Sequence, residues 1–136
     1  MKKLILIFLT FLSALTMGIG QEIVGMNKAE VIQYMKENKS NFIVDGSAKN
    51  TTFKFLKFVD RFGEETLLAF LSEDNLCTST RLISDYSNMN TRVKELNKKY
   101  AKIGENKWEY EMKGIKYIIE LKKDEWYFTI QTKKKE

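Results

Sequence analysis

The last third of the chain shows a nearly strict alternation of apolar and polar side chains, and this pattern constrains the fold more than any other feature. It runs through residues 107–112, 115–121 and 125–131, and Lys113-Gly114 separates the first two segments. The apolar series are Trp108, Tyr110 and Met112; Ile115, Tyr117, Ile119 and Leu121; and Trp126, Phe128 and Ile130. Alternation places each series on one face of its strand. The pattern predicts a three-stranded antiparallel meander that is covered on one side.

A first helix is predicted from a capping signature near residue 27. Asn27 can accept a hydrogen bond from the backbone, and Glu30 can reach back to complete a capping box. Val31, Tyr34 and Met35 then recur at helical spacing, so one face of this helix is apolar. We expect that face to pack on a sheet.

A second helix is predicted over residues 89–103. Its apolar stripe recurs every three or four residues, at Met89, Val93, Leu96, Tyr100 and Ile103. Gly104 follows, where a glycine commonly ends a helix. A coiled-coil seam is the alternative, but two heptads without continuation favour a helix that packs on a sheet of the same chain.

Three further strands are predicted between the two helices, over residues 52–59, 66–71 and 76–83. Residues 60–63 (DRFG) supply a hairpin turn after the first of them. The second, TLLAFL, is apolar on both faces. The segment 37–50 is rich in turn-forming residues, and we interpret it as a connection that allows a short extended piece at residues 42–44.

The predicted fold class is therefore α+β, with two helix-plus-three-strand units in the order α-β-β-β-α-β-β-β. The halves span about residues 25–86 and 87–136. We expect an antiparallel sheet with both helices packed on one face, within a single domain over residues 21–136. About 116 residues suffice for a hydrophobic core without disulfides.

The N-terminus has the layout of a secretory signal peptide over residues 1–20. Two lysines precede a short apolar run from Leu4 to about Leu15, and Gly18 and Gly20 occupy the positions that a signal peptidase reads. A membrane anchor is the alternative, but the run is shorter than the roughly 20 residues that span a bilayer. We expect an exported protein, periplasmic or secreted, without a stable membrane anchor after cleavage.

Charge argues against nucleic acid as a partner. The chain carries 23 basic and 18 acidic side chains, and removal of Lys2 and Lys3 with the leader lowers its net charge from +5 to +3. The lysines are interleaved with glutamates, whereas nucleic-acid binding needs a basic face or stripe. The partner expected from this reading is another exported or envelope protein, and the oligomeric state is open.

Several classes of catalysis find no support in the residues. The chain has no histidine, so Ser-His, Cys-His and His-zinc sites are excluded. The seven glycines form no phosphate-binding loop, and no serine has a lysine three residues after it. We predict no catalytic residues, no cofactor and no metal site.

Cys77 is the only cysteine, so it can form no disulfide within the chain. We expect a buried thiol; pairing between molecules is the alternative. Arg81 lies on the same strand face by parity, but at roughly 13 Å along an extended strand it is too distant to activate the sulfur. Carboxylates such as Glu109 and Glu111 could serve a hydrolase, although nearby Lys107 and Lys116 favour ion pairing instead.

Ile118 and Tyr127 are apolar exceptions on the charged face of the predicted meander. By parity they could form a small apolar island ringed by Lys116, Glu125 and Thr129. An apolar centre with a polar rim is typical of a protein-binding surface. Coverage of both residues by strand twist or by the C-terminal tail is the alternative.

Residues 25–31 (GMNKAEV) resemble the first helix of modules in the outer-membrane assembly lipoprotein and β-lactamase-inhibitor-protein group. Residues 67–76 (LLAFLSEDNL) are similar to the apolar strand, acidic turn and returning strand of that group. The resemblance covers about residues 25–83, and it implies a three-stranded sheet that faces a partner protein. The chain has neither the lipid-attachment cysteine nor the Gly-x-Pro that ends the first helix there. It is also similar to small uncharacterised exported proteins of Gram-negative bacteria.

Taken together, these features predict a non-catalytic exported protein that binds another protein through an open sheet face. A protein that binds a small apolar ligand or lipid between sheet and helices is the alternative, and it requires a cavity. A hydrolase that uses carboxylates or Cys77 has the least support.

Overall fold

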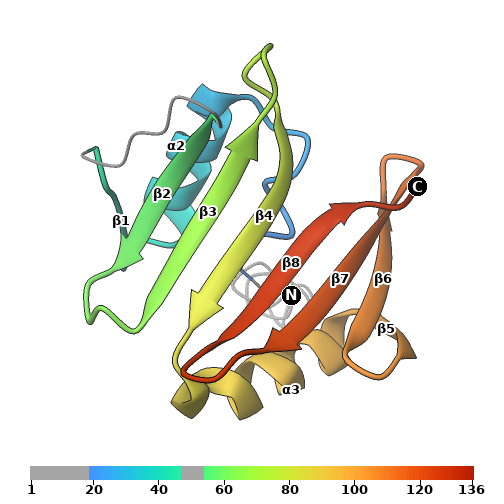
Figure 1. The fold of residues 1–136 in the computed structure, drawn as a ribbon. Helices are drawn as coiled ribbons and strands as arrows, with labels where there is room; N and C mark the ends of the chain where they lie inside the picture. Colours follow the sequence, from blue (N-terminus) through green and yellow to red (C-terminus); the bar gives the residue numbers. More distant parts are fainter. Residues whose placement is uncertain (1–18, 47–53) are drawn as a thin grey trace, which may run out of the picture.

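The computed structural model describes residues 19–46 and 54–136, which form an antiparallel sheet with two α-helices (Figure 1). Residues 1–18 of the leader predicted at 1–20, and the start of the strand predicted at 52–59, lie outside these residues. The helices are α2 (Lys28–Asn38) and α3 (Met89–Lys99), with the 3-10 turn η1 (Tyr86–Asn88) before α3. The strands are β1 (Phe42–Val44), β2 (Phe55–Asp60), β3 (Glu65–Leu71), β4 (Cys77–Ser84), β5 (Ala101–Gly104), β6 (Lys107–Met112), β7 (Ile115–Lys123) and β8 (Phe128–Lys134).

The eight strands of the described residues form one sheet in the order β1-β2-β3-β4-β8-β7-β6-β5. Every neighbouring pair is antiparallel. The last strands of the two halves, β4 and β8, pair at the centre, whereas the strands that follow the helices, β1 and β5, form the two edges. The sheet is thus continuous across both halves (Figure 1).

Among the described residues, each half contains a helix and four strands, not the helix and three strands predicted. The short extended piece at residues 42–44 is the edge strand β1. Residues 101–103, predicted as the end of the second helix, belong instead to β5, which pairs with β6. The helix ends at Lys99 because Tyr100 is extended, with φ −123° and ψ 155°. Ile103 continued the helical spacing by coincidence, and its side chain is 50% exposed.

The capping box predicted at the start of α2 is confirmed. The Asn27 side chain accepts a hydrogen bond from the Glu30 backbone at 2.9 Å, and the Glu30 side chain accepts one from the Asn27 backbone at 3.2 Å. Lys113 and Gly114 both have positive φ, as a tight two-residue hairpin requires. Local signals therefore placed both features correctly.

A bulge in β4 separates Cys77 from Arg81. The pairing with β3 shifts between Phe70 and Leu71, so that Phe70 lies opposite Ser79 but Leu71 lies opposite Cys77. The extra residue turns Cys77 into the core with the Leu82 series, and Arg81 points to the other face. The parity argument that put Cys77 and Arg81 on one face is wrong for this reason.

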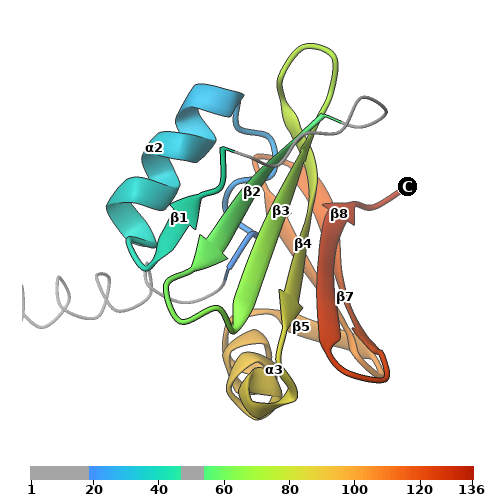
Figure 2. The same cartoon turned by 60° about the vertical axis from the view of Figure 1, so that its left-hand side comes forward.

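Side chains from both helices and from one series of strand residues form a single hydrophobic core. The helices contribute Val31 and Met35 from α2 and Leu96 from α3. The strand series contributes Leu56, Phe58, Leu67, Ala69, Cys77, Leu82, Trp108, Ile119, Leu121, Phe128 and Ile130. In two views, α2 runs beside β1 and β2, and α3 crosses below the end of β4 (Figure 1 and Figure 2).

Trp126 was predicted in the buried series but is 78% exposed. The backbone N–H of Asp124 donates to the carbonyl of Tyr127 at 2.8 Å, which closes a turn with Trp126 near its tip. Strand β8 therefore begins at Phe128, three residues later than the alternation over 125–131 indicates.

A largely buried ion pair fixes α3 to the sheet. Arg92 of α3 donates from Nε to Glu65 Oε2 at 2.9 Å, and a second guanidinium nitrogen contacts the other carboxylate oxygen. The Ser84 hydroxyl also donates to Glu65 at 2.9 Å. The Glu65 and Arg92 side chains are 6% and 17% exposed, so the pair is shielded from water.

The segment at residues 19–25 crosses the interior of the fold. Ile19, Ile23 and Val24 are buried. The carbonyl of Gly20 accepts a hydrogen bond from the Thr80 hydroxyl, and the Gln21 amide donates to Thr132. Gly20 has φ +98°, and a Cβ there would lie 2.7 Å from Thr80 Oγ1. Ile19 and Gly20, the last residues of the predicted leader, thus pack against the described core.

Candidate protein-binding surface

The strand residues that alternate with the core series point to the opposite side of the sheet, which we call the open face. Its central row runs Lys57, Leu68, Arg81, Gln131 and Glu120 across β2, β3, β4, β8 and β7. The row beside it, toward the end of β4, runs Val59, Thr66, Ile83, Thr129 and Lys122. The third row runs Phe55, Phe70, Ser79, Lys133, Ile118 and Glu109.

The half of the open face formed by β2, β3 and β4 carries large apolar side chains. We call this group the apolar patch: Phe55, Val59, Leu68, Phe70 and Ile83. Each is partly exposed, and none belongs to the core cluster. The rings of Phe55 and Phe70 lie 6.4 Å apart, and the Arg81 guanidinium carbon lies 5.7 Å from the centre of the Phe70 ring. These contacts give the patch a defined shape without burying it.

Cations border the apolar patch. Leu68 lies directly between Lys57 on β2 and Arg81 on β4. Over the described open face, cationic positions outnumber anionic ones: Lys57, Arg81, Lys107, Lys116, Lys122 and Lys133 against Asp45, Glu109, Glu111 and Glu120. Lys57 lies 3.6 Å from Asp45 and forms an ion pair with it. The surface therefore combines apolar area with a positive surrounding.

A hollow of about 270 Å³ lies at the centre of the open face, beside the apolar patch. Ile83 and Thr129 lie directly opposite each other in its lining, and Arg81 and Lys122 supply positive charge. Asp124, Tyr127 and Gln131 complete it. The Tyr86 hydroxyl donates to the carbonyl of Asp124, which links the β7–β8 turn to the start of α3. The hollow can receive one projecting side chain of a partner.

The half of the open face formed by β6, β7 and the end of β8 is charged, and its ion pairs follow the predicted cross-strand pattern. Lys116 lies 3.5 Å from Glu109, and Lys135 lies 3.2 Å from the same carboxylate. The hydrogen bond from Lys135, followed by the charges of Lys135 and Lys116, keeps the pKa of Glu109 below its usual value. Glu109 is thus held as an ion-pair partner.

The structure does not bring Ile118 and Tyr127 together as one island. Ile118 pairs with Lys133, whereas Tyr127 precedes β8 at the opposite end of the same hairpin. Six residues of strand separate the two positions, or roughly 20 Å. The alternation of side chains assigned Ile118 and Tyr127 to the charged face, but alternation does not give the distance between two residues along the strands. Neither side chain is buried: Ile118 is partly exposed and Tyr127 is 41% exposed.

The other predicted residues of the island are divided in the same way. Lys116 is at the Ile118 end and is engaged with Glu109. Thr129 lines the central hollow with Tyr127. Glu125 is exposed in the β7–β8 turn. The structure thus brings Tyr127 and Thr129 together and leaves the other three outside the hollow.

The apolar patch itself was missed at the level of sequence, although a signal for it exists. The run TLLAFL in β3 has apolar side chains on both faces of the strand. Strand β2 likewise carries Phe55 and Val59 between its core residues. A strand that is apolar on both faces must be covered twice or leave one apolar face open. Which of these applies depends on where the helices pack, and this is not a local property of the strand.

Cys77 is buried, as predicted, and it is held as a neutral thiol. Its side chain is 1% exposed, and burial raises its pKa to about 12. Its sulfur lies 3.5 Å from the Ser79 carbonyl and donates to it. Within residues 19–46 and 54–136, no group of three metal-ligating side chains is found, and no helix is long and apolar enough to cross a membrane.

Comparisons of the chain with models of protein families, with characterised proteins and with solved structures found no match. The resemblance of residues 25–83 to the assembly-lipoprotein and inhibitor-protein group therefore stays a prediction.

Proposed function

We propose that the chain is an exported, non-catalytic protein-binding module that uses the open face of its sheet. In this proposal both helices pack on one side and leave the other side available. The observation that carries it is the apolar patch, because five large apolar side chains lie outside the core on strands whose other face is already buried.

The chemistry of the open face indicates the kind of partner. Arg81 and Lys57 flank Leu68, and Arg81 and Lys122 line the hollow. We expect a partner surface with an apolar anchor side chain and acidic residues around it, since electrostatic complementarity gives specificity and a fast association. The anchor would enter the hollow beside Ile83, and apolar side chains around it would cover Phe70.

A matched pair of variants tests the proposal. Leu68→Glu places a carboxylate between Lys57 and Arg81, where cross-strand ion pairs support the fold while the apolar patch and its positive border are lost. Ala29→Glu makes the same charge change in the exposed first turn of α2, where a negative charge is favourable. Neither variant should change the thermal midpoint by more than a few degrees.

The readout is capture of a partner by the purified protein from the extracytoplasmic fraction of its source cell, followed by affinity measurement with that partner. We expect the wild type and Ala29→Glu to bind equally and Leu68→Glu to bind at least about tenfold more weakly. Equal binding by folded Leu68→Glu would rule out the open face as the binding surface.

A further inference from the structure

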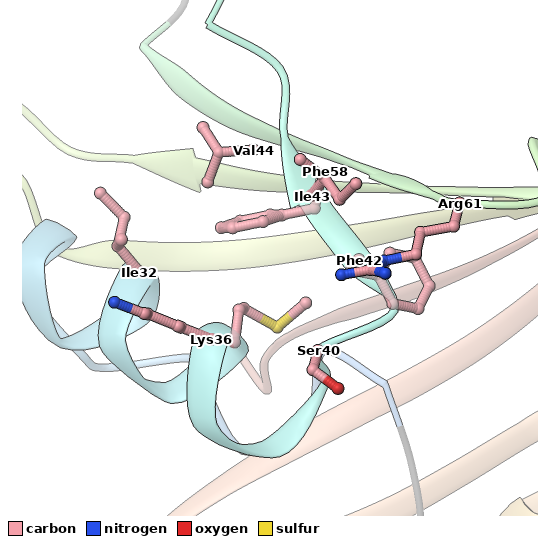
Figure 3. A pocket seen from close by; sticks show the side chains of 9 residues that line it. Ile32, Lys36, Ser40, Phe42, Ile43, Val44, Phe58 and Arg61 are labelled. Carbon is pink, nitrogen blue, oxygen red and sulfur yellow. The ribbon is translucent and has the colours of Figure 1, made fainter.

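A second surface, separate from the open face, lies between α2 and the edge strand β1 (Figure 3). It is a groove of about 310 Å³. Its floor consists of Met35, Phe42 and Phe58, which are 1%, 5% and 1% exposed. Ile32 extends into it from α2, and Val44 lies on the opposite side (Figure 3). The groove is thus apolar at its base and open to solvent above.

The strand beside the groove has backbone groups available for pairing. Asn41 and Asp45 form hydrogen bonds with β2, through Arg61 N–H to Asn41 O at 2.9 Å and Asp45 N–H to Lys57 O at 2.8 Å. Hydrogen-bonding directions alternate along an antiparallel strand, so the N–H and C=O of Val44 point away from β2 toward the edge. An edge with such groups is a template for an added strand.

The side chains of this edge are also unusually apolar for a solvent-facing position. Ile43 is 52% exposed and Val44 is 43% exposed. Edge strands in soluble proteins are usually protected by charges or proline. Here two β-branched apolar residues of the edge strand are exposed: Val44, which pairs with Phe58, beside the groove, and Ile43, which pairs with Val59, toward the open face. Such exposure favours a bound partner over bare solvent.

Two cations stand at the rim of the groove. Lys36 projects from the last turn of α2, and Arg61 follows β2 (Figure 3). Both are exposed, and neither forms an ion pair with another residue of the described chain. None of the described lining residues is acidic. The groove therefore presents positive charge above an apolar floor.

We propose that this groove binds an extended acidic segment of a partner protein, which adds to β1 as a further strand. The backbone of that segment pairs with Val44, one apolar side chain enters the groove above Phe58, and its carboxylates pair with Lys36 and Arg61. This is β-strand addition, in which backbone hydrogen bonds give affinity and pockets for alternate side chains give specificity.

Charge selects this occupant over a second copy of the chain. Pairing of two β1 edges would bring Lys36 and Arg61 of both copies to one junction, without an acidic lining residue to offset them. The volume is at the lower end of the range for small-molecule sites, and it suits one or two side chains better than a whole ligand.

A synthetic peptide Glu-Thr-Val-Thr-Glu, whose valine and glutamates lie on one face of an extended strand, tests the proposal, with Lys-Thr-Val-Thr-Lys as its control. We expect saturable binding of the glutamate peptide alone, measured by fluorescence anisotropy. In Lys36→Glu/Arg61→Glu this binding should weaken by at least about tenfold. Lys28→Glu/Lys94→Glu, which reverses two exposed charges outside the groove, should leave it unchanged.

Hydrogen exchange of the Val44 amide gives a readout at the proposed contact, because this N–H should be protected only when the peptide adds to β1. Absence of saturable binding, equal binding of both peptides, or binding without slower exchange at Val44 would each overturn the proposal. A concentration-dependent dimer that protects the same amide would identify a second copy as the occupant instead. Leu68→Glu should leave peptide binding unchanged, which separates this site from the open face.

Discussion

Replacement of Arg92 by leucine should lower the free energy of unfolding by about 3–5 kcal/mol. In the native structure the Glu65 carboxylate is 6% exposed and accepts hydrogen bonds from Arg92 and from the Ser84 hydroxyl. In the leucine variant the guanidinium is absent, and of these two donors only the Ser84 hydroxyl still contacts the Glu65 carboxylate. A buried charge that has lost its counter-charge is the source of the expected loss.

The double variant Glu65→Leu/Arg92→Leu separates the charge effect from packing. It removes both charges together, and replacement of a whole buried ion pair by apolar residues is commonly neutral or stabilising. We therefore expect the double variant to be clearly more stable than Arg92→Leu. Leucine keeps most of the apolar contact that the arginine stem makes with its surroundings, so packing contributes the smaller part.

Urea denaturation followed by circular dichroism measures both differences, because urea, unlike guanidinium chloride, does not screen charges. Lys94→Leu is the control, since Lys94 is exposed on the same helix and its loss should cost no more than about 0.5 kcal/mol. An equal loss of unfolding free energy in Arg92→Leu and Lys94→Leu would refute the role of the buried Glu65 charge. A double variant as unstable as Arg92→Leu would refute it as well.

Three further predictions concern Cys77, the β6–β7 turn and the buried residues Ile19 and Gly20. Because burial raises the Cys77 pKa to about 12, thiol labelling should be slow until the protein unfolds. Stability should fall as the pH rises from about 9, and Cys77→Ala should lack the part due to the thiol, up to about 1.4 kcal/mol per pH unit. Buried Tyr34, Tyr100 and Tyr110, whose pKa values are also raised, should keep a slope above about pH 10 in both proteins. Gly114→Ala should lower the free energy of unfolding by about 1 kcal/mol, because φ is +77° there while nothing lies within 4 Å of the new Cβ. Gly46→Ala is equally unhindered but has no positive φ, so urea denaturation should show it to be neutral or slightly stabilising. A chain that begins at Gln21 lacks buried Ile19 and the hydrogen bond to the Gly20 carbonyl, so it should unfold about 2–3 kcal/mol more easily than one that begins at Ile19. Equal midpoints would contradict this.

Features that depend on neighbouring residues could be predicted from the sequence. The Asn27 and Glu30 capping box and the Lys113-Gly114 turn are local, because each requires particular side chains within a few positions. The alternation in β6 and β7 likewise gave the correct face for the buried residues Trp108, Tyr117, Ile119 and Leu121, since a strand has a fixed period of two, although Ile115 at the start of β7 is 37% exposed.

Features that depend on distant contacts could not be predicted in the same way. Ile103 fits a helical stripe, yet pairing of residues 101–104 with β6 makes them a strand. Parity put Ile118 and Tyr127 on one side, but only the β7–β8 register shows that they lie at opposite ends of the hairpin. The apolar patch required the pairing of β2, β3 and β4 together with the position of the core, and no single strand contains that information.

Site-specific photo-crosslinking tests the central claim, that the open face binds a partner protein, most directly. A photoreactive residue in place of Phe70 lies on the open face, and one in place of Ala29 lies on the exposed side of α2. In the source cell, we predict a discrete crosslinked protein from position 70 and none from position 29. The same product from both positions, or from position 29 alone, would contradict the account.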